Sequence, residues 1–219
     1  MGPEATLVFL EKFYALTRSH REQDRPGLLL DMEPAVPDRN AAWRGSGPSP
    51  GEALLAMGRR LARAGADFCV MPCVTAHGFA ADFEREAGIR LLRLPDVVAD
   101  ALAAGRHTRP GLLATTTTLD MGLFGEALAA RGIRDAVVPG AADQDALMRT
   151  IYAIKRGADV RADVLDMAER LVARGADVVL VGCTDLSTLH LTEARGSPVV
   201  DALDLLARRT FEEAGCAPD

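Results

Sequence analysis

The chain contains one sequence pattern twice, and each copy ends in a cysteine. Residues 61–75 read LARAGADFCVMPCVT, and residues 171–184 read LVARGADVVLVGCT. Glycine, aspartate and cysteine recur at one constant offset of 110 residues, half of the 219-residue chain (Gly65/Gly175, Asp67/Asp177, Cys73/Cys183). Self-similarity at a fixed period indicates a duplicated structural unit. Because the period is half a domain-sized chain, we expect two related lobes that present one thiol each to a shared cleft. That geometry suits a reaction needing an acid and a base on opposite faces of a small molecule.

Apolar runs alternate with helical patterns along the chain, which indicates parallel sheets built from βαβ units. We predict helices over 4–19, 50–65, 76–87, 119–131, 142–156, 160–174 and 201–214. We predict strands over 27–32, 67–72, 89–94, 110–115, 134–138, 177–182 and 197–200. Ligands of such folds bind beyond the carboxyl ends of the strands, and both Cys73 and Cys183 follow an apolar run. Asp67 and Asp177, which precede these runs, are expected to be turn or capping residues.

The predicted fold is α/β, with two pseudo-symmetric lobes and an active site in the cleft between them. Each lobe is expected to be a mainly parallel sheet flanked by helices. Lobe one is predicted to span 1–97, with 200–219 returning to it, and lobe two to span 98–199.

The repeat is incomplete at its amino end. In the second half, strand 110–115 precedes helix 119–131, whereas helix 4–19 follows only Gly2 and Pro3. The repeat therefore predicts a strand of about six residues ahead of Met1. Without that strand, the sheet of the first lobe is expected to have an exposed edge or a gap beside the cleft.

Composition narrows the classes of function. The formal charge is −6 without a basic patch, which argues against nucleic-acid binding. No apolar run approaches the ~20 residues of a membrane helix, and no basic-then-apolar leader opens the chain, so we expect a cytoplasmic protein. A pyridoxal phosphate site needs a Schiff-base lysine, and the lysines are Lys12 and Lys155. The four histidines show no metal-ligand spacing with the cysteines, so neither a cofactor nor a metal is expected.

The cysteines of the repeat are candidates for acid–base chemistry. A thiol just before a helix N-terminus feels the positive end of the backbone dipole, which lowers its pKa. A single free cysteine is most often a small buried apolar residue, but two at matched positions, each followed by threonine, favour a function. Cys69 lies inside an apolar run and is expected in the core. Cys216 lies in the tail, and the sparse cysteines are expected to be reduced.

The motifs resemble those of the cofactor-independent aspartate/glutamate racemases, in particular the aspartate branch. The matching segments are MGPEAT at 1–6, VPDR at 36–39, GPSP at 47–50, GADFCVMPCVTAH at 65–77, LLATTTTLDMGLF at 112–124, IYAIKRG at 151–157 and GADVVLVGCTDL at 175–186. The resemblance covers nearly the whole chain. It implies two pseudo-symmetric lobes with the active site between them, neither pyridoxal phosphate nor metal, and a homodimer.

The resemblance also implies roles for individual residues. It makes Cys73 and Cys183 a two-base pair, in which one thiolate removes the α-proton and the opposite thiol delivers a proton to the other face. The substrate-binding residues it implies are Arg39 and Lys155 for a distal carboxylate, and Thr75, Thr118 and Thr184 for the reacting carboxylate, with Thr115 in the same threonine-rich loop. A guanidinium binds a carboxylate bidentately, whereas a lysine adds a point charge.

Several positions depart from the family pattern. Val74 stands where the family usually has asparagine, and valine offers no side-chain donor or acceptor. Thr117 stands where the family usually has glycine, and threonine would be strained if φ were positive there. Asp185 stands where the family commonly has glutamate and is expected to orient a polar group. His77 is expected to tune the Cys73 thiol, to cap the helix that follows or to pack in the interior. These departures concern the substrate side and not the thiols, so proton transfer is a firmer expectation than aspartate as the substrate. We expect aspartate or a related acid, with a less polar or larger acid or a secondary-metabolite precursor as the alternative.

Other readings of the same residues remain open. A cis–trans isomerase of a dicarboxylate would use one cysteine as a nucleophile and bind the diacid through Arg39 and Lys155. Decarboxylases of the same superfamily need one catalytic thiol, so the presence of both cysteines argues against that activity. A degenerate, non-catalytic member that only binds a ligand would be consistent with Val74 and Thr117.

Overall fold

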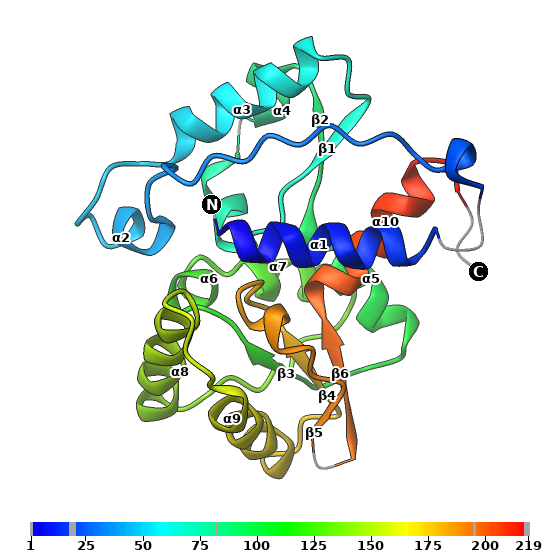
Figure 1. The fold of residues 1–219 in the computed structure, drawn as a ribbon. Coiled ribbons are helices and arrows are strands. Elements are labelled where there is room, and N and C mark those ends of the chain that lie inside the picture. Colours follow the sequence, from blue (N-terminus) through cyan, green and yellow to red (C-terminus); the bar gives the residue numbers. More distant parts are fainter. Residues whose placement is uncertain (1, 18–20, 82, 195, 217–219) are drawn as a thin grey trace.

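Two sheets, one in each lobe, organise the molecule and confirm the predicted α/β fold with two lobes. The computed structural model describes residues 2–17, 21–81, 83–194 and 196–216. Lobe one contains the parallel pair β1 (Phe68–Val70) and β2 (Arg90–Leu92). Lobe two contains a sheet in the order β3 (Pro110–Leu113), β4 (Val178–Val181), β6 (Ser197–Asp201) and β5 (Glu193–Ala194). The pairs β3–β4 and β4–β6 are parallel, and β5 joins the edge antiparallel. Figure 1 shows the two sheets in the upper and lower halves of the molecule.

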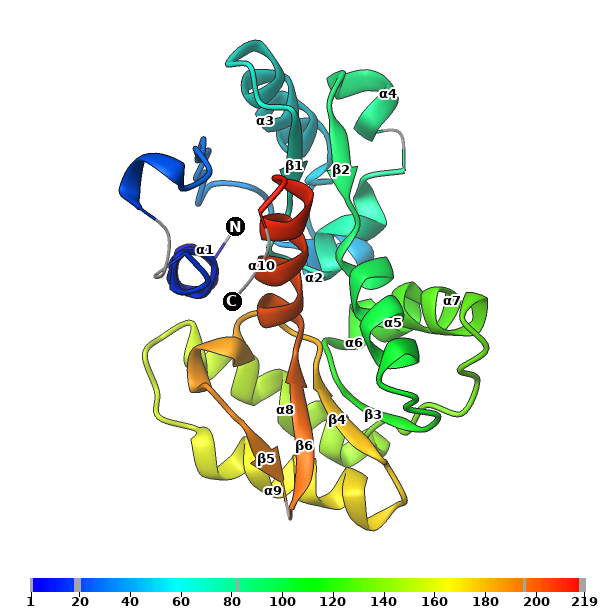
Figure 2. The same cartoon turned by 90° about the vertical axis from the view of Figure 1, so that its right-hand side faces the viewer.

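Helices cover both sheets and fill the space between the lobes. The α-helices are α1 (Pro3–Ala15), α2 (Arg39–Trp43), α3 (Gly51–Arg63), α4 (Phe83–Ala87), α5 (Leu94–Ala104), α6 (Thr116–Asp120), α7 (Leu123–Ala130), α8 (Ala141–Ile154), α9 (Arg161–Ala173) and α10 (Ala202–Glu213). Helix α10 packs against α1 and α5, and these helices lie at the junction of the lobes (Figures 1 and 2). They share one apolar cluster with β3 and β4. The largest apolar cluster therefore joins the two lobes.

The sequence repeat is also a structural repeat. Helices α3 and α9 both end at a glycine with positive φ, Gly65 at +87° and Gly175 at +90°. In each copy the residue after that glycine donates its N–H to the carbonyl five residues earlier, at 3.2 Å in lobe one and 3.1 Å in lobe two. Such caps require a left-handed residue, which glycine adopts without strain. Strands β1 and β4 then begin at residues that also differ by 110.

Two predicted helices are broken. The segment 76–87 forms the 3₁₀-helix η2 (Thr75–Phe79) and then α4, with residue 82 outside the described residues. Gly78 packs closely against Met121, and helical geometry is lost at Ala80. The segment 119–131 divides into α6 and α7 because Gly122 adopts a left-handed φ of +66°. Predicted helix 4–19 ends at Ala15, and its residues 18–19 lie outside the described residues.

Two predicted strands are not formed as strands. Residues 27–32 are extended but form no ladder, because β1, on the other side of a cavity, is not within pairing distance. The segment 134–138 contributes a single parallel bridge, between Val137 and Gly111. Sequence inspection missed α2, β5, α5 and the short 3₁₀-helices η1 (Glu22–Asp24) and η3 (Leu186–Leu189). Pro95, in the first turn of α5, is the start signal that could have revealed that helix.

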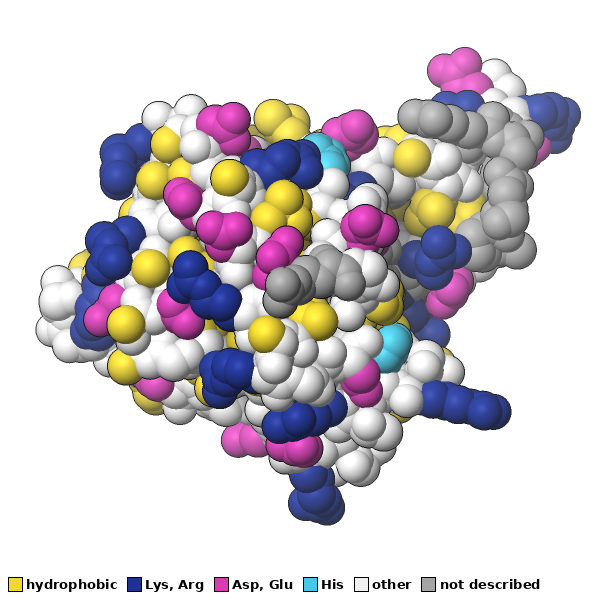
Figure 3. Space-filling view, turned by 90° about the horizontal axis from the view of Figure 1, so that it is seen from below, with side chains coloured by type: hydrophobic (Ala, Val, Ile, Leu, Met, Phe, Trp, Pro, Cys, Tyr) yellow, Lys and Arg dark blue, Asp and Glu magenta, His cyan; other side chains and the backbone are white. Residues whose placement is uncertain are grey.

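The surface carries both signs of charge. Seen from below in Figure 3, Lys and Arg side chains alternate with Asp and Glu side chains over lobe two. Within the described ranges, no helix has the length and apolar character needed to cross a membrane.

Candidate active site

Both cysteines of the repeat reach one small cavity between the lobes. Cys73 follows β1 and Cys183 follows β4, so each thiol lies at the carboxyl end of its own sheet. The cavity has a volume of about 20 Å³. The predicted site residues that line it are Arg39, Cys73, Val74, Thr75, Thr115, Lys155, Cys183, Thr184 and Asp185. His77 and Thr118 are bonded to lining residues from behind. The structure therefore brings together the residues that the sequence singled out from both halves of the chain.

Cys183 occupies a buried, acidic environment. Its Sγ lies 3.9 Å from Oδ2 of Asp185. Burial, followed by the Asp185 carboxylate, raises the pKa of the Cys183 thiol and keeps it protonated. The lowering expected from a helix N-terminus is therefore wrong for this residue. The segment that follows it is only the four-residue 3₁₀-helix η3, and its dipole does not offset the loss of solvation.

Arg39 supplies a cation beside the other thiol. It is the first residue of α2, whose N-cap Asp38 accepts a hydrogen bond from the backbone N–H of Ala41 at 2.7 Å. Burial works against the charged form of Arg39, but attraction to Cys73, and then to Asp38 and Asp185, outweighs burial and raises the pKa of Arg39. A guanidinium in this position stabilises negative charge on the Cys73 sulfur. The two thiols thus face charged neighbours of opposite sign.

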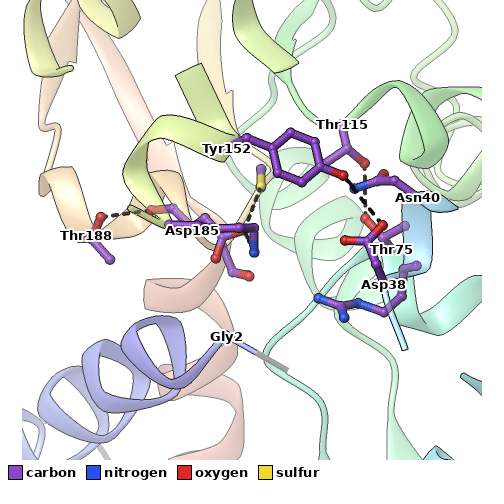
Figure 4. A network of polar contacts seen from close by, with 12 residues as sticks. Gly2, Asp38, Asn40, Thr75, Thr115, Tyr152, Asp185 and Thr188 are labelled. Carbon is purple, nitrogen blue, oxygen red and sulfur yellow. Dashed lines mark hydrogen bonds and ion pairs between the residues drawn. The ribbon is translucent and has the colours of Figure 1, made fainter. Parts of the chain in front are cut away.

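Lys155 is paired within the protein. Its Nζ lies 2.7 Å from Oδ2 of Asp185. Burial disfavours the charged form of Lys155, but the Asp185 carboxylate raises its pKa, so the ammonium persists. The amino end of α1 also meets this pair, since a Cβ on Gly2 would lie 3.0 Å from Oδ1 of Asp185. Figure 4 shows Asp185 between the start of α1 and the end of α8. A helix N-terminus stabilises such a carboxylate.

Three threonine hydroxyls form a closed cluster behind the thiols. The Oγ1 atom of Thr75 lies 3.0 Å from that of Thr115 and 2.8 Å from that of Thr118, and the last two are 2.9 Å apart. Each hydroxyl has one proton to donate, so the three contacts use all three donors. An incoming carboxylate must take over at least one of them. Thr75 and Thr115 line the cavity, and Thr118 supports them from behind.

Thr184 ties the two cysteine loops together. Its hydroxyl donates a hydrogen bond of 3.0 Å to the carbonyl of Pro72, the residue before Cys73. This bond spans the boundary between the lobes. It fixes the loop that carries one thiol relative to the loop that carries the other.

His77 is a neutral positioning residue. The backbone N–H of Leu94 donates to its Nε2 at 3.1 Å, so the proton is on Nδ1, which donates to the carbonyl of Cys73 at 3.0 Å. Burial lowers the pKa of His77 to about 4. The imidazole therefore orients the backbone of Cys73 and anchors it to the start of α5.

One family of racemases matches nearly the whole chain. A sequence model of the Asp/Glu/Hydantoin racemase family matches residues 1–210. The chain belongs to this family. Its structure is similar to that of the Picrophilus torridus aspartate racemase, with a TM-score of 0.87 and 27% sequence identity over 100% of this chain and 93% of that chain.

One further solved structure is similar in fold, and one further relative is similar in sequence. An aspartate racemase homologue from Pyrococcus horikoshii has a TM-score of 0.76 and 22% identity over 97% of this chain and 95% of its own. An uncharacterized protein from Pectobacterium carotovorum is 33% identical over 135 residues, 60% of this chain and 89% of the relative. The two-lobed arrangement thus extends across the whole chain.

Two departures from the family pattern have clear structural consequences. Thr117 lies inside α6, and within the described part of the chain only Arg106 and His190 among non-glycine residues have positive φ. The strain considered for Thr117 is therefore not present. Val74 is buried, belongs to the main apolar cluster and lines the cavity, so it forms an apolar part of the wall.

Sequence inspection missed a polar group on the wall of this racemase-family cavity. The amide nitrogen of Asn40 donates to the Tyr152 hydroxyl at 3.3 Å, and that hydroxyl donates to Asp38 Oδ1 at 3.5 Å (Figure 4). Tyr152 lies three residues before Lys155 on α8, a spacing that places both on one helix face. That spacing, and the position of Asp38 directly before Arg39, were the available signals.

As for metals, no three His, Cys, Asp or Glu side chains in the described ranges form a group that could hold an ion.

Proposed function

We propose that the protein is a cofactor-independent racemase of an acidic amino acid, such as aspartate, or of a closely related acid. One observation carries the proposal. Cys73 and Cys183 come from matched positions of two separate sheets and line the same cavity, together with the cations Arg39 and Lys155. Acid–base groups that approach a carbon from two sides are what inversion at that carbon requires.

The environments of the two thiols suggest how the proton transfer runs. Cys73, as a thiolate beside Arg39, removes the α-proton, and the electron pair of the broken C–H bond delocalises into the substrate carboxylate. Cys183, kept protonated by burial and Asp185, gives its proton to the opposite face of the carbon. The reaction leaves Cys73 as the thiol and Cys183 as the thiolate. The reverse reaction starts from that state, so no external acid or base is consumed.

The remaining polar groups suggest how the substrate is held. In our proposal the Thr75, Thr115 and Thr184 side chains and nearby N–H groups receive the reacting carboxylate, where negative charge develops. Arg39 and Lys155 receive a distal carboxylate, which would compete with Asp185 for the lysine. A cavity of about 20 Å³ has room for roughly one water molecule. Substrate entry therefore requires the lobes, or the segment that carries α2, to move apart.

Exchange of the α-proton tests the proposal directly. The purified protein is incubated in D2O with each enantiomer of aspartate, glutamate and related acids. Loss of the α-proton NMR signal together with chiral inversion is the expected result. Absence of exchange across this panel, with a folded protein, would contradict the proposal. Conversion of maleate to fumarate or release of carbon dioxide, without inversion, would indicate the isomerase or decarboxylase reading instead.

Assembly and location stay predictions. We expect a homodimer that works in the cytoplasm, on a small acid and without a nucleic-acid or membrane partner. Sedimentation velocity over a range of protein concentrations measures the oligomeric state. A monomer at all concentrations would contradict the expected dimer.

A further inference from the structure

Asn40 carries a buried polar atom without a partner on the wall of the active-site cavity. The residue is 6% exposed and lines the cavity that contains both thiols. Its Oδ1 is buried and accepts no hydrogen bond from the described residues. Buried polar atoms in folded proteins nearly always have a partner, and an unmet acceptor is unfavourable. Such an atom on the wall of a binding site indicates that a ligand supplies the missing donor.

The hydrogen bonds behind Asn40 determine which end of its amide is free. The Nδ2 atom of Asn40 donates to the Tyr152 hydroxyl at 3.3 Å. That hydroxyl has one proton, which it donates to Oδ1 of Asp38 at 3.5 Å. Because the hydroxyl can then only accept from the amide, Oδ1 is the free end of Asn40. A chain of hydrogen bonds that ends at a carboxylate also polarises the amide and strengthens its oxygen as an acceptor.

The charged acceptors of the same cavity already have partners. Asp38 caps α2 by accepting from the N–H of Ala41 at 2.7 Å. Asp185 lies 2.7 Å from the ammonium of Lys155. Among the buried side-chain acceptors that line this cavity in the described ranges, Oδ1 of Asn40 alone has no partner. A donor on the ligand therefore has one open position on the wall.

The neighbours of Asn40 indicate which group of the substrate that donor is. Asn40 follows Arg39 in α2, and successive residues of a helix are turned by roughly 100°, so the two side chains meet different groups of one ligand. Helix α2 also packs against η2 and α6, next to Thr75 and Thr115. Figure 4 shows Asn40 with these threonines on one side of the view and Asp185 on the other. In the proposed function Arg39 and the threonines receive carboxylates, which leaves the amino group.

Val74 offers no alternative partner for an amino group. It is 2% exposed, lines the same cavity and belongs to the main apolar cluster. Its side chain has no acceptor, although the family usually has asparagine at this position. An amide is nevertheless present in the cavity, and it enters from α2 through Asn40.

We propose that Asn40 determines specificity for an amino group, with its Oδ1 accepting a hydrogen bond from the α-ammonium of the substrate. This role rests on the proposed function, which makes the substrate an acidic amino acid. With its ammonium and both carboxylates held, the α-carbon keeps one free substituent, the hydrogen. That hydrogen then points to Cys73 in one enantiomer and to Cys183 in the other. Tyr152 acts as a positioning residue, because it orients the amide without touching the substrate.

Paired acids with and without the amino group test the proposal. Isothermal titration calorimetry measures the Kd of aspartate and of succinate, which has the same two carboxylates but hydrogen in place of the ammonium. Asn40→Leu keeps the size of the side chain and should weaken aspartate binding about 10-fold or more, because a hydrogen bond to a charged group is lost. Succinate binding should not weaken. Equal losses for both acids, or no loss for either, would overturn the proposal.

Gln144 provides the matched control. It is another buried amide, and its Nε2 donates to the carbonyl of Ala114 at 3.0 Å. Its Oε1 also lacks a partner among the described residues, but Gln144 does not line the cavity. Gln144→Leu should leave the ratio of aspartate to succinate affinity unchanged. A fall of that ratio as large as in Asn40→Leu would contradict a contact between Asn40 and the ammonium. Asn40→Ala, with the same expected loss, serves as the second variant if the leucine variant does not fold.

Exchange of the α-proton separates a failure of this contact from a failure of the proposed function. Exchange by the unchanged protein, with the same affinity ratio in the Asn40 variants, would overturn the contact and leave the racemase activity in place. A lower ratio in these variants without any exchange would support the contact and contradict the racemase activity. Glutamate and glutarate give the same comparison for a longer acid. If the unchanged protein bound neither amino acid, the proposed contact would be overturned.

Discussion

The two halves of the molecule repeat one another closely at the helix caps and differ at the sheets. Helices α3 and α9 end in the same glycine cap, and β1 and β4 begin at matched residues. Yet β4 lies inside a four-stranded sheet, whereas β1 pairs only with β2 among the described residues and borders a cavity of about 820 Å³. A cap depends on residues that are adjacent in the sequence, while a strand needs a partner from elsewhere. The comparison shows that local features of a duplication persist where the long-range pairing does not.

The two thiols of the active site also combine a repeated position with different surroundings. They hold equivalent positions in the repeat, but Cys73 faces Arg39 while Cys183 faces Asp185. At the 110-residue offset, Arg39 of α2 corresponds to Arg149 of α8, which does not line the cavity, and Asp185 lies beyond the shared motif. Neighbours that do not follow the symmetry thus divide the two equivalent thiols into a base and an acid.

Replacement of each thiol should give the largest effects. Cys73→Ser and Cys183→Ser are each expected to lower racemisation about 10²–10⁴-fold, because a hydroxyl replaces a group matched to the proton transfer. The two variants should differ in α-proton exchange. Cys183→Ser keeps Cys73 and should still exchange the enantiomer whose α-proton faces it. Cys73→Ser keeps a thiol of raised pKa, so its exchange should be slow at pH 7 and rise with pH.

Single-turnover NMR in D2O measures these exchanges for each enantiomer separately. Thermal melting shows whether both variants remain folded. Cys69→Ser is the control, since Cys69 is buried in β1 and does not line the active-site cavity. Equal exchange of both enantiomers by either single variant would rule out the division of roles.

Much of this site could be read from the sequence because its signals are local. The apolar runs before the two cysteines depend on short segments, and the strands predicted there are confirmed as β1 and β4. The raised pKa of Cys183 could not be read in this way, since it arises from burial by distant elements. The strand predicted at 27–32 does not form, for a related reason. Its apolar pattern is that of a strand, but pairing requires a neighbour that its own sequence does not provide.

Truncation of one matched leucine pair should show how tightly each helix packs against the sheet of its lobe. Leu171 is fully buried against β3, so Leu171→Ala should reduce the free energy of unfolding by about 3–5 kcal/mol. Leu61, its counterpart, lines the cavity beside β1 and is partly exposed. Leu61→Ala should cost only about 1 kcal/mol, because less apolar contact is lost. Urea unfolding followed by circular dichroism measures both values.

Exposed Leu7 in α1 supplies the baseline for that experiment. Leu7→Ala should change the free energy of unfolding by no more than about 0.5 kcal/mol. Equal losses for Leu61→Ala and Leu171→Ala would mean that Leu61, beside the cavity, is packed as tightly as Leu171 is against β3. The structural difference between the two lobes would then have no energetic counterpart.

His77 and Ser187 are a further matched pair. Each connects a cysteine loop to the start of a helix, but through different chemistry. His77 accepts from the N–H of Leu94, at the start of α5. Ser187, 110 residues later, donates to Asp201 Oδ1 at 2.7 Å, and that oxygen also caps α10 by accepting from the N–H of Leu203. The arrangement is equivalent, but an imidazole titrates near neutral pH and a hydroxyl does not. His77 in lobe one should therefore make the free energy of unfolding sensitive to acid pH, whereas Ser187 in lobe two should not.

The sign of that sensitivity follows from the two states of His77. The unfolded imidazole has a pKa near 6.5, and burial lowers the folded value to about 4. Between these values the unfolded chain binds a proton that the folded chain does not. The contribution of His77 to stability is thus complete above pH 6.5 and falls by about 3 kcal/mol as the pH drops to 4, with no further loss from this group below. His77→Gln should be less stable at pH 7 but lack this fall, whereas Ser187→Ala should keep it. Urea unfolding of the three proteins from pH 4 to 8 measures the difference, and a parental slope in His77→Gln would show that another group is responsible.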